Sequence, residues 1–176
     1  AGDFIYQIAV KRRRDSLEHI KRALLEGYKL IGEAMRNDRG MLGIPTGFTR
    51  LDSMLSGLQG GQLVVVAGRP GMGKTSFALN IAQHVAIRDR VPTAVFSLEM
   101  SREQLALRML CGEAHVDSQK TRTGDLSNDD LDKLAWAVDV LEKAPLYVDD
   151  SPTVTVMEML AKARRLKQER GLGLVI

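Results

Sequence analysis

Residues 62–87 read QLVVVAGRPGMGKTSFALNIAQHVAI, and they limit the possible folds of this chain more than any other stretch. The β-branched run at 62–67 predicts a buried strand, and apolar residues at helical spacing predict a helix over 76–87. The loop between them matches Gly-x-x-x-x-Gly-Lys-Thr. Such loops turn backbone N–H groups towards phosphate oxygens, and the helix N-terminus adds partial positive charge. The order strand, loop, helix therefore predicts a site for a nucleoside triphosphate.

Each residue type in this loop has an expected task. Glycines allow positive φ and close approach of the backbone to phosphate. Lys74 would reach the β- and γ-phosphates, and the Thr75 hydroxyl would bind Mg²⁺ as the metal ligand. The expected nucleotide-binding residues are Gly68, Arg69, Pro70, Gly71, Met72, Gly73, Lys74, Thr75 and Ser76.

Hydrolysis would also need one carboxylate that acts on water and one that acts on the metal. Glu99 follows a predicted strand at 93–98, at the sheet edge where parallel sheets bind ligands. Its alternative role is to complement the dipole of the next helix. Asp149 ends the apolar run PLYVD, as a metal-side acid would, but the strand at 172–176 could equally precede such an acid. The pattern alone leaves these two alternatives nearly even.

From about residue 61 the chain alternates predicted strands with amphipathic helices. Near-continuous apolar strands in this arrangement predict an α/β fold with a parallel sheet covered on both faces. Two of the helices open with capping boxes, Ser101 with Gln104 and Thr155 with Glu158. A third begins near residue 127, and its expected buried face holds Leu131, Leu134, Ala135, Val138 and Leu141.

The first forty residues show another pattern. Apolar residues recur every three or four positions and predict one helix, with Asp15 and Glu18 near its start. A solitary helix is marginally stable in water, so this stripe must pack against another surface. That surface could be its own domain, or it could be a neighbouring subunit or an upstream domain. We favour packing on a neighbouring subunit or an upstream domain. The stripe consists of Leu17, Ile20, Leu24, Tyr28, Ile31 and Met35.

Composition limits the compartment and the partners. No apolar run approaches the roughly 18 residues that a membrane span needs, so no membrane partner is expected. Cys111 is the only cysteine, which excludes an intrachain disulfide and fits a reducing, cytoplasmic compartment. The net charge of +3 permits a nucleic-acid partner, but the basic run at 11–14 is more commonly a solvated face.

Five segments together resemble replicative DNA helicases of the DnaB type, which are hexameric ring motors with a RecA-like ATPase domain. They are 43–82, VFSLEMS (95–101), RMLC (108–111), TRTGDLS (121–127) and 148–176. The resemblance implies an α/β, RecA-like P-loop NTPase core that is incomplete and is preceded by an extended linker helix. It implies the end of a collar domain at 1–14, a linker helix and hinge at 15–42, and the first half of the ATPase domain at 43–176.

The same resemblance assigns roles to residues. Glu99 matches the water-activating glutamate, and Lys74 and Thr75 match the phosphate-loop ligands of ATP and Mg²⁺, so Glu99 and Lys74 are the expected catalytic residues. The family's metal-side aspartate would follow Ile176, which makes Asp149 the end of a strand without a metal role. The arginine finger and DNA-binding loops are also expected downstream, so this chain alone should hydrolyse ATP poorly.

The resemblance implies coupling of Mg-ATP hydrolysis to translocation on single-stranded DNA and to unwinding at the replication fork. A homo-hexamer would form through the linker helix, with primase and helicase loader as partners. Two alternatives stay open: another RecA-like ring ATPase, such as a recombinase or regulatory ATPase, and a nucleotide-binding interaction module without activity. A small-molecule phosphotransferase is less favoured, because no substrate-binding residues are evident beside the loop.

Overall fold

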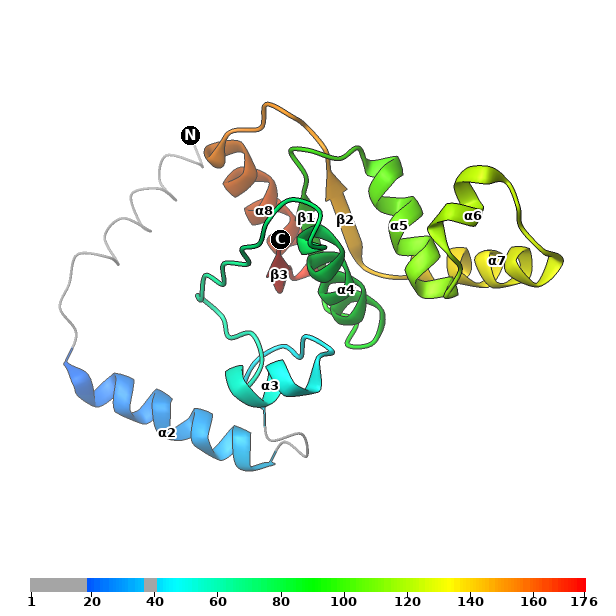
Figure 1. Cartoon of the computed structure of the whole chain (residues 1–176). Helices are drawn as coiled ribbons and strands as arrows, with labels where there is room; N and C mark the ends of the chain where they lie inside the picture. Colours follow the sequence, from blue (N-terminus) through cyan, green and yellow to red (C-terminus); the bar gives the residue numbers. More distant parts are fainter. Residues whose placement is uncertain (1–18, 37–40) are drawn as a thin grey trace. The chain divides into compact units, whose positions relative to one another are not determined.

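The computed structural model describes residues 19–36 and 41–176 (Figure 1). The chain forms two compact units, Ala1–Leu42 and Gly43–Ile176. In the first unit, helix α2 (Ile20–Arg36) carries the predicted apolar stripe on its exposed surface. The expected cap at Asp15 and Glu18, Leu17 and the predicted collar segment 1–14 lie outside the described residues.

A parallel sheet forms the centre of the second unit. Its strands are β1 (Thr93–Phe96), β2 (Leu146–Asp149) and β3 (Leu174–Val175), in the order β2-β1-β3. Both pairings are parallel, and Phe96 lies opposite Asp149 at the end of the β1–β2 ladder. The predicted parallel α/β arrangement is therefore confirmed for these three strands.

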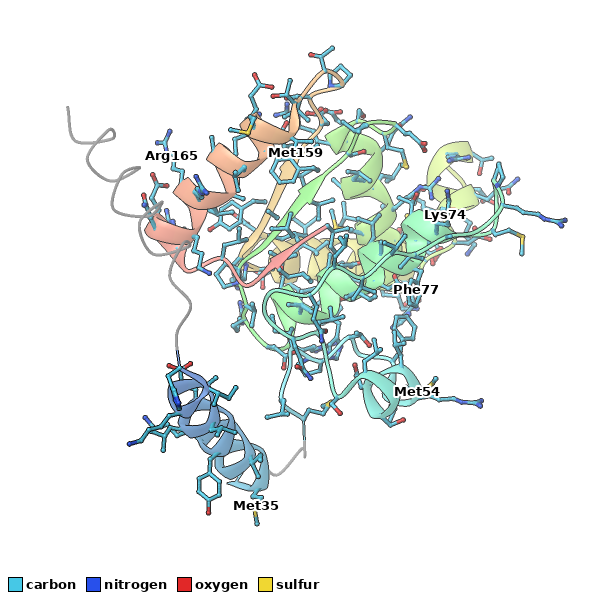
Figure 2. All side chains as sticks on the ribbon, turned by 90° about the vertical axis from the view of Figure 1, so that its left-hand side faces the viewer. Met35, Met54, Lys74, Phe77, Met159 and Arg165 are labelled. Atoms are coloured by element: carbon cyan, nitrogen blue, oxygen red, sulfur yellow. The ribbon has the colours of Figure 1, made fainter. Side chains whose placement is uncertain are left out.

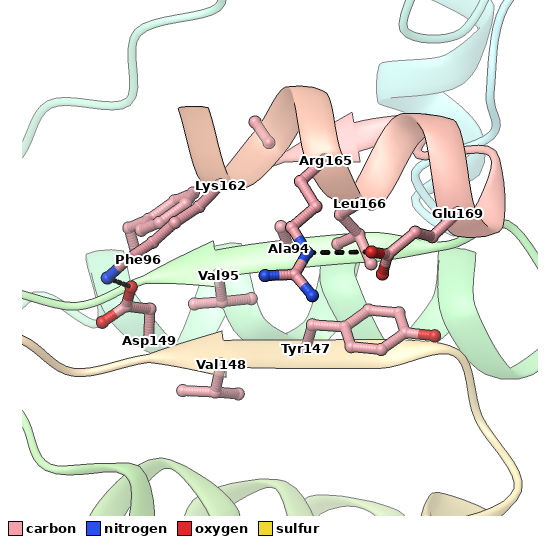
Figure 3. A pocket seen from close by; sticks show the side chains of 11 residues that line it. Ala94, Val95, Phe96, Tyr147, Val148, Asp149, Lys162, Arg165, Leu166 and Glu169 are labelled. Atoms are coloured by element: carbon pink, nitrogen blue, oxygen red, sulfur yellow. Dashed lines mark hydrogen bonds and ion pairs between the residues drawn. The ribbon is translucent and has the colours of Figure 1, made fainter. Parts of the chain in front are cut away.

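Helices cover both faces of this sheet. Apolar residues of α4 and α5 pack against Val95 on one face. Tyr147 points from the opposite face towards α8 (Figure 3). Both predicted capping boxes are present at the starts of α5 and α8. The helices of this unit are α3 (Thr49–Leu55), α4 (Lys74–Ile87), α5 (Arg102–Ala114), α6 (Ser118–Thr123), α7 (Asn128–Glu142) and α8 (Val156–Arg170).

The core lies between α4, α5 and the sheet. Its buried residues are at most 5 % exposed, which removes their apolar surface from water and holds the three elements together. They are Leu79, Ala82, Val95, Leu105 and Met109. Because α4 contributes to this core, the loop that precedes it is attached to a fixed support.

The expected buried face of α7 was partly wrong. Ala137 is fully buried, and Leu134 and Leu141 are half-buried, as three residues on one helical face should be. Ala135 is exposed instead, and Leu131 and Val138 remain about half exposed, at 50 % and 48 %. Ala137 belongs to the buried cluster that joins α7 to the end of α5, so this face of α7 is turned inward.

The predicted strand at 62–67 does not form. This segment has no regular secondary structure, and Leu63 and Val65 are 88 % and 77 % exposed. A β-strand is stabilised by hydrogen bonds to a neighbouring strand. Within the described residues β3 pairs only with β1, so the other edge of β3 is open. Because 62–67 pairs with none of the described strands, its apolar side chains stay exposed.

Candidate nucleotide-binding site

The loop at 68–76 ends in an uncapped helix N-terminus. Gly71 and Gly73 have φ of +77° and +84°, and a Cβ on either would meet no atom within 4 Å, so the backbone faces open space there. Gly73 is the N-cap of α4 and supplies no side-chain hydrogen bond. Within the described part of the chain, the amides of Lys74, Thr75 and Ser76 have no acceptor. These free donors and the helix dipole suit an anion, and they fit the phosphates of a nucleotide.

The loop and Glu99 lie at the same edge of the sheet. The amide of Val91 donates to the carbonyl of Val85 (3.2 Å), so the end of α4 meets the start of β1. Helix α4 consequently runs back along the sheet, and its first residue, Lys74, lies towards the end of β1. Glu99 follows that end, and Figure 1 shows the start of α5 beside the head of the β2 arrow.

A segment that precedes the loop supports α4 from another side. The rings of Phe48 and Phe77 stack with centroids 4.9 Å apart, which links the residue before α3 to the first turn of α4. Figure 2 labels Phe77 on that turn. Gly47, with φ of +86°, lies against the His84 imidazole so closely that a Cβ would come within 2.5 Å of it. Only glycine fits at this approach, since both the backbone angle and the space exclude a side chain.

The structure also shows contacts of the loop that were missed from the sequence. Arg108 Nη1 of α5 lies 3.4 Å from Ser76 Oγ, so α5 reaches the first turn of α4. The position of Arg108 seven residues after Ser101 gives no sequence signal for this contact. It depends on how α4 and α5 pack together.

Asp149 is fully engaged by protein groups. Its Oδ1 accepts hydrogen bonds from the Ser151 amide (3.0 Å) and hydroxyl (2.6 Å), and its Oδ2 pairs with Lys162 of α8. The Lys162 ammonium, followed by Ser151, lowers the pKa of Asp149 to about 2. A carboxylate whose two oxygens already have these partners has little capacity left to bind a metal. This agrees with the expectation that Asp149 ends a strand without a metal role.

A separate hollow of about 250 Å³ lies between α8 and strands β1 and β2 (Figure 3). Phe96, Tyr147 and Leu166 line it, and the pairs Lys162–Asp149 and Arg165–Glu169 border it. Neither Glu99 nor any residue of 68–76 contributes to its wall. The hollow is therefore distinct from the phosphate loop.

One residue of the loop could contribute to a metal site. Among the described residues, no cluster of three or more His, Cys, Asp or Glu side chains could hold a metal ion. The Thr75 hydroxyl, at the start of α4, is a group that could hold Mg²⁺ beside the phosphates of a bound nucleotide. In the same residues, no helix is long and apolar enough to cross a membrane.

Comparison with known proteins identifies the family. The model of the DnaB-like helicase C-terminal domain matches residues 43–176. The chain belongs to this family. It is 46 % identical over 173 residues to the replicative DNA helicase DnaC of Bacillus subtilis, and 45 % identical over 172 residues to the replicative DNA helicase DnaB of Geobacillus stearothermophilus. Each match covers 98 % of this chain and 38 % of the relative.

Solved structures give the same fold. The ATPase domain of G40P superposes with a TM-score of 0.82 at 29 % identity, over 91 % of this chain and 56 % of that one. A DnaB-like replicative helicase, solved in a study of its interactions with primase, gives a TM-score of 0.78 at 29 % identity, over 92 % of this chain and 38 % of that one. The predicted DnaB-type, RecA-like ATPase fold is confirmed, and with it a nucleotide-binding domain.

Proposed function

We propose that this chain is part of a hexameric replicative DNA helicase that couples Mg-ATP hydrolysis to translocation on single-stranded DNA and to unwinding at the fork. The observation that carries this proposal is the uncapped start of α4 behind two glycines of positive φ, at the same sheet edge as Glu99. Family membership supports the helicase over other RecA-like ATPases. The chain spans 38 % of the length of the two bacterial relatives, so the activity is assigned to the longer protein.

Each site residue has a task in this proposal. The free backbone amides within 68–76 and the Lys74 ammonium would hold the phosphates of ATP, and the Thr75 hydroxyl would hold Mg²⁺, which would offset the negative charge of the phosphates. Glu99 orients and deprotonates the attacking water. Lys74 and Glu99 have exposed side chains without a hydrogen bond or ion pair in the described part of the chain, so both are free to act on a ligand.

Partners follow from the exposed apolar surfaces. The stripe of α2 would pack on the ATPase unit of a neighbouring subunit and close the homo-hexamer. Leu131 and Val138 of α7 offer an apolar surface of the kind that such a helix needs. In this proposal, primase, a helicase loader and the replication fork are partners of the whole protein. The proposal also places that protein in the cytoplasm. One structural relative was studied together with primase.

The proposal is tested with a hybrid helicase, in which residues 43–176 replace the matching segment of the Bacillus subtilis relative. The hybrid should form hexamers and unwind a forked duplex with ATP and Mg²⁺, and its Lys74→Ala variant should not. A hybrid that forms hexamers and binds nucleotide but neither hydrolyses ATP nor unwinds the fork would contradict the proposal.

A further inference from the structure

The turn that carries Glu99 is closed by one serine hydroxyl. Ser97 is the first residue after β1, and its Oγ donates to the carbonyl oxygen of Met100 (2.7 Å). The same Oγ accepts a hydrogen bond from the Met100 amide (3.1 Å). A single side chain therefore satisfies both backbone groups of a residue three positions later and encloses Leu98 and Glu99 between them.

The start of this turn is fixed to the sheet. The Ser97 amide donates to the carbonyl of Asp149 (2.8 Å), which continues the β1–β2 ladder one residue beyond Phe96. Ser97 is half-buried, so its contacts are partly shielded from water. The backbone before Glu99 consequently has little freedom to move.

The end of the turn is fixed by Asp150. Its Oδ2 accepts from the Arg102 amide (3.0 Å), and its Oδ1 receives Nε (3.0 Å) and Nη2 (2.7 Å) of the Arg102 guanidinium. This pairing lowers the pKa of Asp150. Arg102 is the first residue of α5, so the carboxylate joins the end of β2 to the start of that helix.

The side chain of Glu99 contrasts with this fixed backbone. Glu99 is exposed, and within the described residues it makes no hydrogen bond or ion pair. A carboxylate without a protein partner, held on an anchored turn, is arranged to meet a molecule that comes from outside the chain. Preorganisation of this kind contributes to catalysis by removing the need to orient the group during the reaction.

We propose that Ser97 is the positioning residue for Glu99, with Asp150 fixing the other end of the same turn. This inference rests on the proposed role of Glu99 as the residue that orients water. Ser97 acts through the backbone of the turn and does not touch the nucleotide. Its loss should therefore lower the rate of hydrolysis while leaving nucleotide affinity intact.

The test measures steady-state ATP hydrolysis and binding of a fluorescent ADP analogue by the hybrid helicase. Ser97→Ala should lower kcat at least about tenfold, because misplacing a reacting group by about 1 Å costs up to about 10²-fold, with Kd for the analogue within about twofold. Ser97→Thr keeps the hydroxyl and should keep kcat within about threefold. Ser53→Ala is the matched control, since Ser53 Oγ also donates to a backbone carbonyl, that of Arg50 (2.8 Å).

Asp150→Asn gives a second variant, in case Ser97→Ala does not fold. It should lower kcat without changing Kd or the Mg²⁺ concentration for half-maximal rate, and a raised Mg²⁺ requirement would show a metal ligand and overturn the proposal. If Glu99→Gln is inactive but Ser97→Ala keeps an unchanged kcat, the positioning role of Ser97 is refuted and the role of Glu99 stands. Where Ser97→Ala does not fold, an unchanged kcat in Asp150→Asn refutes the positioning role in the same way. Full activity of Glu99→Gln would refute the proposed role of Glu99 itself.

Discussion

Replacing Asp52 with alanine tests how the segment before the phosphate loop is held. Asp52 lies in α3 and is 6 % exposed. Its Oδ1 accepts from the amide and the hydroxyl of Thr46 at 2.7 Å each, and its Oδ2 accepts from the Gly47 amide at 3.3 Å. Thr46 is 0 % exposed, so water cannot replace the carboxylate as an acceptor for its two donors.

The magnitude follows from these two buried donors. A buried donor left without an acceptor costs about 1–3 kcal/mol, so two of them predict a loss of about 2–6 kcal/mol. Removing a buried carboxylate also relieves its own desolvation, which offsets part of this cost. We expect Asp52→Ala to lower the free energy of unfolding by about 2–4 kcal/mol.

The assay is urea unfolding of the 176-residue chain, followed by far-ultraviolet circular dichroism. Asp132→Ala is the control, because Asp132 is exposed on α7 and has no partner among the described residues. Its change should stay within about 0.5 kcal/mol. A loss for Asp52→Ala no larger than that of the control would refute the reasoning from buried donors.

Three further predictions concern other contacts. Gly173→Ala should lower the free energy of unfolding by about 1–3 kcal/mol in the same assay, because its Cβ would come within 2.3 Å of Val91 Cγ1. Gly60→Ala places its Cβ in open space and should not lower the free energy of unfolding, so an equal loss in both variants would contradict the prediction. Hydrogen bonds from Ser127, followed by Lys120, lower the pKa of Asp130 to about 2. The stability that Asp130 contributes is therefore complete above its unfolded pKa of about 3.8 and is lost as pH falls through about 2, and Asp130→Asn should remove that part of the acid dependence in unfolding curves measured against pH. Lys74→Ala should weaken binding of a fluorescent ATP analogue at least about tenfold in titrations, and unchanged affinity would show that the ammonium does not contact phosphate.

Much of the site could be predicted because its information is local. The glycine spacing at 68–76, the helix after it and the capping boxes of α5 and α8 depend on residues a few positions apart. Glu99 could be placed for the same reason, since it directly follows an apolar strand. The assigned roles of these residues stay predictions.

Long-range pairing could not be predicted in the same way. The composition of 62–67 is typical of a strand, but a strand also needs a neighbour, and none of the described strands pairs with it. Ala137 of α7 belongs to the buried cluster that joins this helix to the end of α5, and a periodic apolar pattern alone does not decide whether Leu134 or Val138 is the more buried. The anchoring of Arg102 by Asp150 joins residues 48 positions apart.

Hydrolysis of ATP by the hybrid helicase and its Glu99→Gln variant tests the central claim most directly, when measured beside nucleotide affinity. We predict that Glu99→Gln binds the ATP analogue as the unaltered hybrid does but loses at least about 10²-fold in kcat, the lower range for a general base. Equal turnover by both proteins would contradict the claim that Glu99 orients the attacking water at this site.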